Sequence, residues 1–451
     1  MTPKTYDFLI KGGLILSGAG IQKADVGIKG EQIASVNAHL PPDEANHVID
    51  ASGKYVMPGV IDVHVHPLSV DGLSGSSLTA AYGGTTSLMY FAFAEQGTNL
   101  VDTIKTYQEE GSRDSFLDFG IHGTLFDPAY QIKEIPQVIN LGVTTFKMFM
   151  SYAKLKRMTN DYYLAAAMDL ISECGGLAMV HAENGLVTDY LEDKSLERGE
   201  DPKQIFLATR PDYLEAEAIF RAISIASITN CPLYIVHVST ARGLKPIQQA
   251  KLEGQVVYTE TCPQYLTLTN SIIQQLGPLA KFCPPLRTET DRLALWEAVK
   301  IGLIDTVASD HSPKAKDIYT PFPEASYGSP QAETMLTVTY DEGVNSGRIG
   351  LAKLVQLLSE NPSKIFGLYP KKGVILEGSD ADLIIFDPSQ SHIIQHQNQH
   401  SEASHTLYEG RKCLGKMIFS MQRGKIVIED GIMKARPGDG KFLSSKIDKR
   451  K

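Results

Sequence analysis

Two histidines, His64 and His66, stand two residues apart at the end of the apolar, β-branched segment 60–66. Side chains two residues apart on an extended strand point to the same face, so both imidazoles face one side. Two imidazoles aimed at one point are half of a metal site, because neutral imidazole is a common ligand of zinc and related ions. The alternative is that the pair ends an ordinary core strand.

Other apolar segments also end in side chains that bind metals or move protons. These residues are Lys147 in TTFKMFM, His181 in MVHAE, His237 in IVHVS and Asp310 in TVASD. Each lies near the C-terminal end of its segment, and this is the end of the strands at which a (β/α)8 barrel builds its active site. The pattern therefore favours a metal-dependent active site over an ordinary strand end.

The central part of the chain, residues 58–374, alternates strand-like apolar segments with helix-like segments, which is typical of an α/β protein with a parallel sheet. Eight strands are predicted, at 60–66, 86–91, 117–126, 146–150, 178–183, 233–239, 256–262 and 306–310. Eight parallel strands with helices between them close a TIM, or (β/α)8, barrel.

Both ends of the chain contain short alternating runs separated by glycine and polar turns, which is typical of antiparallel strands. We expect residues 1–57 and 375–436 to form one small β-sandwich domain beside the barrel of residues 58–374. Residues 437–451 are polar and basic, and we expect a loose tail or a strap over a neighbouring subunit.

Composition excludes several classes of partner. The chain has 451 residues and a formal net charge of -9, which argues against binding to nucleic acid or to an anionic membrane. No apolar run reaches membrane-spanning length and the N-terminus lacks signal-peptide features, so a cytoplasmic protein is expected. The five cysteines are scattered without Cys-x-x-Cys spacing and indicate neither a disulfide framework nor a thiolate zinc site. Small molecules and further copies of the chain are the expected partners.

Lys147 is an unexpected member of the ligand set, because an ammonium group cannot bind a metal. It can become a ligand if CO2 adds to the neutral amine, since the resulting carbamate is anionic and offers two oxygens. Burial beside two cations would favour both the neutral amine and the charged product.

The chain resembles the cyclic amidohydrolases, the hydantoinase and dihydropyrimidinase group of the amidohydrolase superfamily. The resemblance spans nearly the whole chain and rests on PGVIDVHVH, TTFKMFMSY, MVHAENG, IVHVS, ETCPQYLTLT, SDHSP, NPSKIFGLYPKKGVILEGSDADLIIFDP and SMQRGKIVIEDG. It implies a (β/α)8 barrel with a β-sandwich, two zinc ions per chain, and hydrolysis of an amide bond in a small cyclic substrate. It also implies a homo-oligomer, a tetramer or a dimer.

The resemblance further assigns roles to the ligand-type residues. His64, His66 and Asp310 are expected to hold the more buried zinc, and the two later histidines the other. Lys147, modified to N6-carboxylysine, would span both ions. A water between two cations loses its proton near neutral pH, and Asp310 would act as general base and then general acid.

Three residues are expected to face the ring. Tyr152 matches the family tyrosine that hydrogen-bonds the substrate carbonyl or the oxyanion. Cys283 stands where a serine that contacts substrate through its backbone is usual, and Tyr327 stands where an asparagine is usual. The segment 68–82 is also shorter than the usual hydantoinase loop. We therefore expect ring recognition that differs from that of the usual dihydropyrimidinase.

Two other functions remain open. SDHSP gives some support to an allantoinase-like ureide hydrolase, although the acidic Glu-Pro-Gly that allantoinases and dihydroorotases carry after the second histidine is absent here. A non-catalytic oligomeric scaffold of the same family is the alternative from another class, and the complete ligand set argues against it. The remaining histidines considered as ligands are expected to be packed or solvated: His122, His311, His392, His396 and His400.

Overall fold

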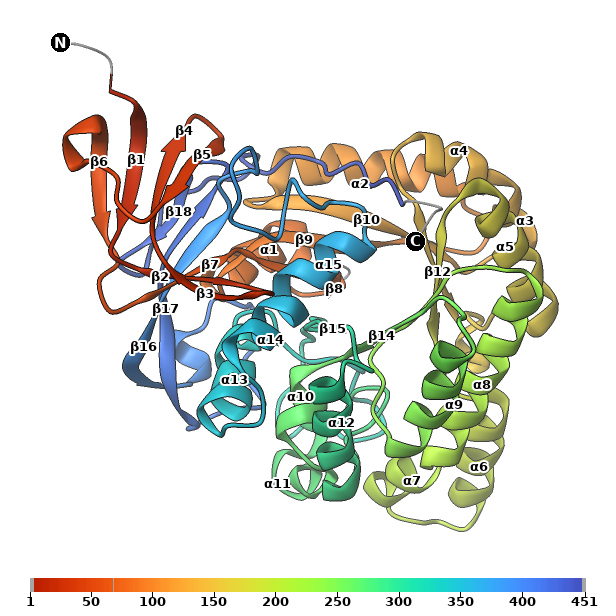
Figure 1. The fold of residues 1–451 in the computed structure, drawn as a ribbon. Coiled ribbons are helices and arrows are strands. Elements are labelled where there is room, and N and C mark those ends of the chain that lie inside the picture. Colours follow the sequence, from red (N-terminus) through yellow and green to blue (C-terminus); the bar gives the residue numbers. More distant parts are fainter. Residues whose placement is uncertain (1–3, 68, 448–451) are drawn as a thin grey trace.

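The computed structural model describes residues 4–67 and 69–447. At its centre lies a sheet of eight parallel strands that follow one another in chain order (Figure 1). These strands are β8 (Val60–Val65), β9 (Thr85–Ala94), β10 (Asp118–Leu125), β11 (Thr145–Phe149), β12 (Leu177–His181), β13 (Leu233–Ile235), β14 (Val257–Thr261) and β15 (Thr306–Val307). A parallel bridge between Val65 and His311 links the last segment back to the first. The sheet is thus a nearly closed barrel, and the predicted fold class is confirmed.

Helices cover the outside of the barrel, because the strands are buried on both faces and need a second layer. Several helices begin at an Asn or Thr whose side chain accepts a backbone N–H, as Asn160 does from Tyr163 at 3.1 Å. The helices are α1 (Gly72–Tyr82), α2 (Leu100–Asp114), α3 (Pro128–Gln131), α4 (Ile135–Asn140), α5 (Asp161–Cys174), α6 (Gly185–Glu197), α7 (Pro202–Ala208), α8 (Asp212–Ile228), α9 (Ala241–Leu252), α10 (Pro263–Thr267), α11 (Ile273–Leu276), α12 (Glu289–Ile301), α13 (Met335–Tyr340), α14 (Leu351–Val355) and α15 (Asn361–Ile365). None of the helices in the described part of the chain has the length and apolar character needed to cross a bilayer.

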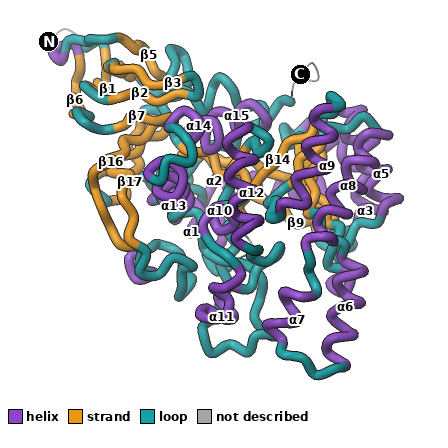
Figure 2. Tube along the Cα trace, turned by 60° about the horizontal axis from the view of Figure 1, so that its bottom comes forward, coloured by secondary structure: helices purple, strands orange, loops and turns teal. Residues whose placement is uncertain are grey.

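Two further sheets come from the chain ends and lie to one side of the barrel (Figure 2). One has the order β5-β4-β1-β6, and the other the order β19-β18-β17-β16-β7-β2-β3. Their strands are β1 (Tyr6–Lys11), β2 (Leu14–Ser17), β3 (Gly20–Lys23), β4 (Asp25–Lys29), β5 (Gln32–Asn37), β6 (Ala45–Asp50), β7 (Tyr55–Pro58), β16 (Leu383–Ile393), β17 (Lys412–Gln422), β18 (Lys425–Glu429) and β19 (Ile432–Met433).

Side chains from both of these sheets share one apolar core, which includes Val26, Ile28, Leu383 and Ile385. Pairing of β7 with β16 joins the two chain ends within one sheet. The chain ends therefore build the smaller β part together, while the domain boundaries at 57/58, 374/375 and 436/437 stay predictions.

The C-terminal segment after β19 runs along the barrel of its own chain. The Phe119 N–H donates to the Lys441 carbonyl at 3.0 Å, and the Leu443 N–H donates to the Phe119 carbonyl at 2.7 Å. The backbone passes so close at Gly440 that a Cβ atom there would lie 2.0 Å from the Leu117 carbonyl oxygen. Residues 437–447 are thus held by contacts within the chain, and residues 448–451 of the predicted tail lie outside the described residues.

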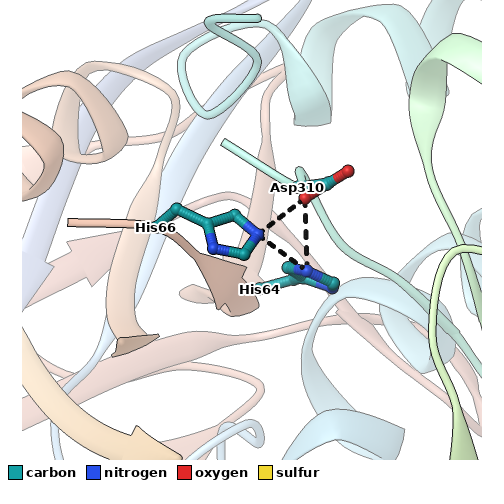
Figure 3. A group of neighbouring side chains, drawn as sticks. All are labelled: His64, His66 and Asp310. Atoms are coloured by element: carbon teal, nitrogen blue, oxygen red, sulfur yellow. Dashed lines mark hydrogen bonds and ion pairs between the residues drawn. The ribbon is translucent and has the colours of Figure 1, made fainter. Parts of the chain in front are cut away.

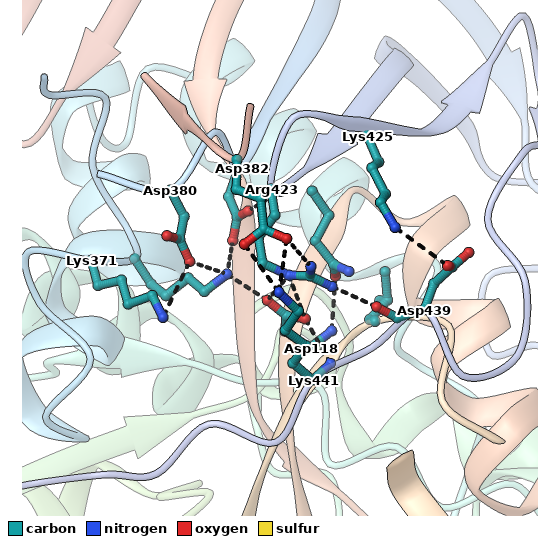
Figure 4. Close-up of polar contacts among 12 residues, drawn as sticks. Asp118, Lys371, Asp380, Asp382, Arg423, Lys425, Asp439 and Lys441 are labelled. Carbon is teal, nitrogen blue, oxygen red and sulfur yellow. Dashed lines mark hydrogen bonds and ion pairs between the residues drawn. The ribbon is translucent and has the colours of Figure 1, made fainter. Parts of the chain in front are cut away.

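A buried ionic cluster joins the barrel to the chain ends (Figure 4). The Lys372 ammonium lies 2.6 Å from Asp118 on β10, 2.9 Å from Asp380 and 2.6 Å from Asp382. Arg423, in the turn between β17 and β18, adds a contact to Asp118 at 3.0 Å. The three carboxylates converge as the ligands of a cation would, and the ammonium of Lys372 supplies that positive charge.

Lys372→Met is expected to lower the free energy of unfolding by about 3–5 kcal/mol, because it leaves buried carboxylates without their partner. Burial already raises the pKa of Asp382 to about 6. Loss of the ammonium would raise it further above its unfolded-state value, so the penalty grows as pH rises and is larger at pH 8 than at pH 5. Urea denaturation at the two pH values measures this effect.

Lys371→Met is the matched control, since Lys371 is 67% exposed and lies 3.9 Å from Asp380. It is expected to change stability by less than about 1 kcal/mol. Equal losses in the two variants would contradict a stabilising role of the buried cluster.

Candidate active site

The six residues predicted as metal ligands line one cavity of about 400 Å³ at the C-terminal ends of the barrel strands. The three residues expected to face the ring line the same cavity: Tyr152, Cys283 and Tyr327. The structure thus brings all nine predicted site residues together. Their individual roles stay predictions.

Three of these residues meet at one point of the cavity (Figure 3). The Nε2 atoms of His64 and His66 are 3.2 Å apart. Asp310 Oδ1 lies 3.2 Å from Nε2 of His64 and 3.0 Å from Nε2 of His66. Two imidazole nitrogens and a carboxylate oxygen this close to one another are a group that could hold a metal ion.

Glu260, at the end of β14, determines which nitrogen of His64 faces the cavity. Its Oε1 lies 2.7 Å from Nδ1 of His64, and when the carboxylate accepts a hydrogen bond from Nδ1, the lone pair of Nε2 faces the other predicted ligands. Glu260 also accepts the His237 backbone N–H at 3.0 Å. Burial holds the pKa of His64 well below its ordinary value, so the imidazole is neutral. Glu260 was not predicted as a site residue, and its position near the end of a predicted strand was the available signal.

His181 has an equivalent partner in Glu183. The two are 2.7 Å apart through Nε2 and Oε2, which leaves Nδ1 of His181 available as a ligand. The His181 and His237 rings pack edge to face with centroids 4.6 Å apart. Glu183, two residues after His181, is thus in contact with a predicted ligand although it was not predicted as a site residue.

Lys147 is buried in the same cavity, and its Nζ has no hydrogen-bond partner among the described residues. Burial lowers the pKa of Lys147 to about 8, so a substantial fraction of the amine is neutral near physiological pH. The Nζ atom lies 4.9 Å from the Phe91 ring centroid and 5.0 Å from that of Phe149. A buried amine without a polar partner is costly.

The strands that precede His237 and Asp310 are shorter than predicted. β13 ends at Ile235 and β15 at Val307, whereas the sequence predicted strands to 239 and 310. His237 has φ 39° and Asp310 has φ 52°, and a left-handed backbone cannot continue a β ladder. Such conformations cost about 1–3 kcal/mol for a residue other than glycine and gather at functional sites.

Tyr152 shares this left-handed conformation, with φ 67°. Its ring packs against the rings of His181, at 5.1 Å, and Tyr327, at 6.2 Å. Burial raises the pKa of Tyr152 well above its ordinary value, so the phenol keeps its proton and can act as a donor. The Tyr327 hydroxyl accepts a hydrogen bond from Arg210 at 3.2 Å. Cys283 is buried, and burial raises its pKa to about 12.

Four of the other histidines considered as ligands have polar partners: His122, His311, His396 and His400. His122 contacts the Val63 carbonyl at 3.0 Å, and burial lowers its pKa to about 3. His311 lies 2.9 Å from Asp71 and is fully buried. His392 lies on β16, and His396 and His400 lie after the end of this strand. None of the three belongs to a metal-binding group among the residues that the structure describes. Of the segment expected to be shortened, Leu68 lies outside the described residues, and α1 begins at Gly72.

Comparison with known proteins gives matches over nearly the whole chain. The model of the amidohydrolase family matches residues 55–427. A D-hydantoinase from Ralstonia pickettii is 36% identical, with 97% of this chain and 98% of the relative covered. An L-hydantoinase from Paenarthrobacter aurescens is 32% identical over the same shares.

Solved structures agree with these relatives. A D-hydantoinase structure has a TM-score of 0.93 at 37% identity, covering 98% of this chain and 99% of that chain. A dihydropyrimidinase from Brevibacillus agri NCHU1002 has a TM-score of 0.93 at 33% identity, with the same coverage. The similarity therefore includes the barrel and the sheets from both chain ends.

Proposed function

The chain belongs to the amidohydrolase family, and from that premise we propose that it opens small rings by hydrolysing a cyclic amide bond. Hydantoins, dihydropyrimidines and related cyclic ureides or imides are the proposed substrates, as the names of its relatives indicate for those proteins. The observation that carries the proposal is the convergence of all six ligand-type residues in one cavity. The products would be ring-opened N-carbamoyl acids or similar carboxylates.

The residues of the cavity fit two divalent metal ions, and their chemistry suits zinc. His64, His66 and Asp310 would hold one ion, and His181 and His237 the other. The buried amine of Lys147, which has no hydrogen-bond partner in the described structure, fits a carboxylated bridge. When bound, the two ions would supply hydroxide at neutral pH and polarise the ring carbonyl.

Asp310 is positioned to move the proton of the reaction. Burial raises its pKa, but the neighbouring His64 and His66 outweigh burial and hold it below the ordinary value. The carboxylate is therefore ionised and can accept a proton from the attacking water. It can then return this proton to the leaving nitrogen of the ring.

Tyr152 is proposed to donate a hydrogen bond to the oxyanion that forms at the ring carbonyl. Tyr152→Phe is expected to lower kcat by roughly 100-fold with little change in KM, because the interaction is made mainly in the transition state. Steady-state kinetics on one hydantoin measures both constants. Tyr162→Phe, at a side chain 76% exposed, is the control and should leave both unchanged. A change in KM alone for Tyr152→Phe would contradict this role.

Two other functions are weighed against this proposal. An allantoinase-like ureide hydrolase would use the same residues on another ring. A non-catalytic scaffold would need no metal. Glu260 contacts His64 and Glu183 contacts His181, and carboxylates that orient predicted metal ligands in this way favour an enzyme. We also propose a homo-oligomer, a tetramer or a dimer, in the cytoplasm.

The decisive experiment combines metal analysis with a substrate panel. We expect about two zinc ions per chain and ring opening of at least one member of a panel of hydantoins, dihydrouracil, allantoin and cyclic imides. Removal of metal by a chelator should abolish the activity, and added zinc should restore it. A protein that contains no metal and opens none of these rings would support the scaffold. Fast turnover of allantoin alone would favour the ureide hydrolase.

A further inference from the structure

Two cationic side chains, Arg157 and Lys314, line the cavity beside the predicted ligands. Arg157 follows Tyr152 by five residues, and Lys314 follows Asp310 by four, so both are carried by segments that bear site residues. The Arg157 side chain is 41% exposed, whereas that of Asp310 is 12% exposed. Arg157 therefore lies on the solvent side of the reacting centre, where a ring substituent would point.

Arg157 is held in place without using all its donors. Its guanidinium carbon lies 4.7 Å from the Phe126 ring centroid, and Nη2 lies 3.1 Å from Glu95 Oε1. The Arg157 backbone N–H also donates to the Tyr152 carbonyl at 3.2 Å. A guanidinium has five N–H donors, so this anchored side chain can still donate to a ligand.

Lys314 lies within the electric field of Arg157. Burial lowers the pKa of Lys314, the positive charge of Arg157 lowers it further, and Asp310 raises it. Both cations line the same cavity, so a carboxylate bound there would be attracted by both.

The wall of the cavity carries more positive than negative side chains, and the Glu95 partner of Arg157 is not among its described lining residues. Apart from the predicted ligand Asp310, the described lining residues include no carboxylate. Among the others are Phe93, Phe126, Leu155 and Phe282, which offer only apolar surface. An apolar wall with two cations on it matches a substituent that has a short carbon chain ending in an anion.

We propose that Arg157 and Lys314 form a binding site for a carboxylate on the ring substituent, so that the preferred substrates are cyclic amides with an acidic side chain. This inference rests on the proposed function and names a substrate class for it. It also gives a physical basis for a ring preference that differs from that of the usual dihydropyrimidinase.

The test compares two substrates of nearly equal size, 5-(2-carboxyethyl)hydantoin and its neutral amide, 5-(2-carbamoylethyl)hydantoin. The metal-loaded enzyme is expected to favour the acid in kcat/KM by about 10- to 100-fold at low ionic strength, the range of charge-assisted hydrogen bonds. Added salt should reduce the preference, because Arg157 is partly exposed to solvent. An acid-to-amide ratio near one would overturn the proposal.

Variants identify the residues that produce the ratio. Lys314→Met and Arg157→Met should each lower the acid-to-amide ratio of kcat/KM by about 3- to 10-fold. A loss of activity that is equal for both substrates does not change this ratio. Lys156→Met is the matched control, because Lys156 is exposed, lies next to Arg157 and is not part of the cavity wall. A similar fall in the ratio for Lys156→Met would overturn the local role. Lys314→Arg and Arg157→Lys keep the positive charge and should retain most of the preference for the acid. They replace the methionine variants in the test if a methionine variant does not fold.

The outcomes separate this inference from the proposed function. Ring opening with equal kcat/KM for acid and amide overturns only the carboxylate site. If no cyclic amide is opened, the proposed function fails. Calorimetric titration of the same two hydantoins into the metal-loaded protein then tests whether the carboxylate site exists. Tighter binding of the acid that is lost in Lys314→Met would support the site, and equal binding would overturn it.

Discussion

Lys147→Ala is expected to lower ring opening by roughly three orders of magnitude, because the metal centre supplies several kcal/mol of transition-state stabilisation. The variant removes the buried amine that has no hydrogen-bond partner among the described residues and with it the group proposed to become the carbamate. Zinc content should fall together with activity. Metal analysis and turnover of one hydantoin measure the two effects.

Chemical rescue distinguishes the lost carbamate from a damaged fold. A short carboxylic acid such as propionate should restore part of the activity of Lys147→Ala, because it can occupy the space of the missing side chain and offer two oxygens. The control is Lys154→Ala, whose exposed side chain pairs with Asp193 and should not respond to propionate. An intact mass that shows unmodified Lys147 in metal-loaded, active protein would contradict the proposed bridge.

Asp310→Asn is expected to lower kcat by roughly two to four orders of magnitude while the fold is retained. Asparagine preserves the shape of the side chain, but its amide cannot accept and return the proton of the reaction. Steady-state kinetics with metal-reconstituted protein measures the loss, and thermal unfolding checks the fold. The loss should be the same for the acidic and the neutral hydantoin, because both need the same proton transfer.

Asp317→Asn is the control for Asp310→Asn, since Asp317 is an exposed carboxylate in the following segment and does not line the cavity. Its kcat should stay within about threefold of the original, as expected for a surface change. A near-normal rate in Asp310→Asn would mean that another base moves the proton. The candidates would be Glu183 and Glu260, the carboxylates that contact His181 and His64.

The barrel and the types of residue at its C-terminal edge can be predicted from local sequence patterns. Strand periodicity and apolar runs are local properties, so all eight barrel strands could be predicted, although the ends of several, among them β9, β13 and β15, differ from the predicted bounds. His64 and His66 were placed on one face of a strand by the same local rule. The histidines at positions 122 and 311 were expected to be packed rather than to bind a metal. In the structure His122 contacts the Val63 carbonyl and His311 contacts Asp71.

Contacts between residues far apart in the chain could not be predicted in this way. Glu260 orients His64 across 196 residues of sequence, and Lys372 meets Asp118 across 254. Such contacts depend on barrel closure and strand register, which no local pattern contains. The left-handed backbone at Asp310 and the joint presence of Arg157 and Lys314 in one cavity have the same origin. The chemistry was visible in the residue types, and its geometry and the charge of its wall came from the packing of segments far apart in the chain.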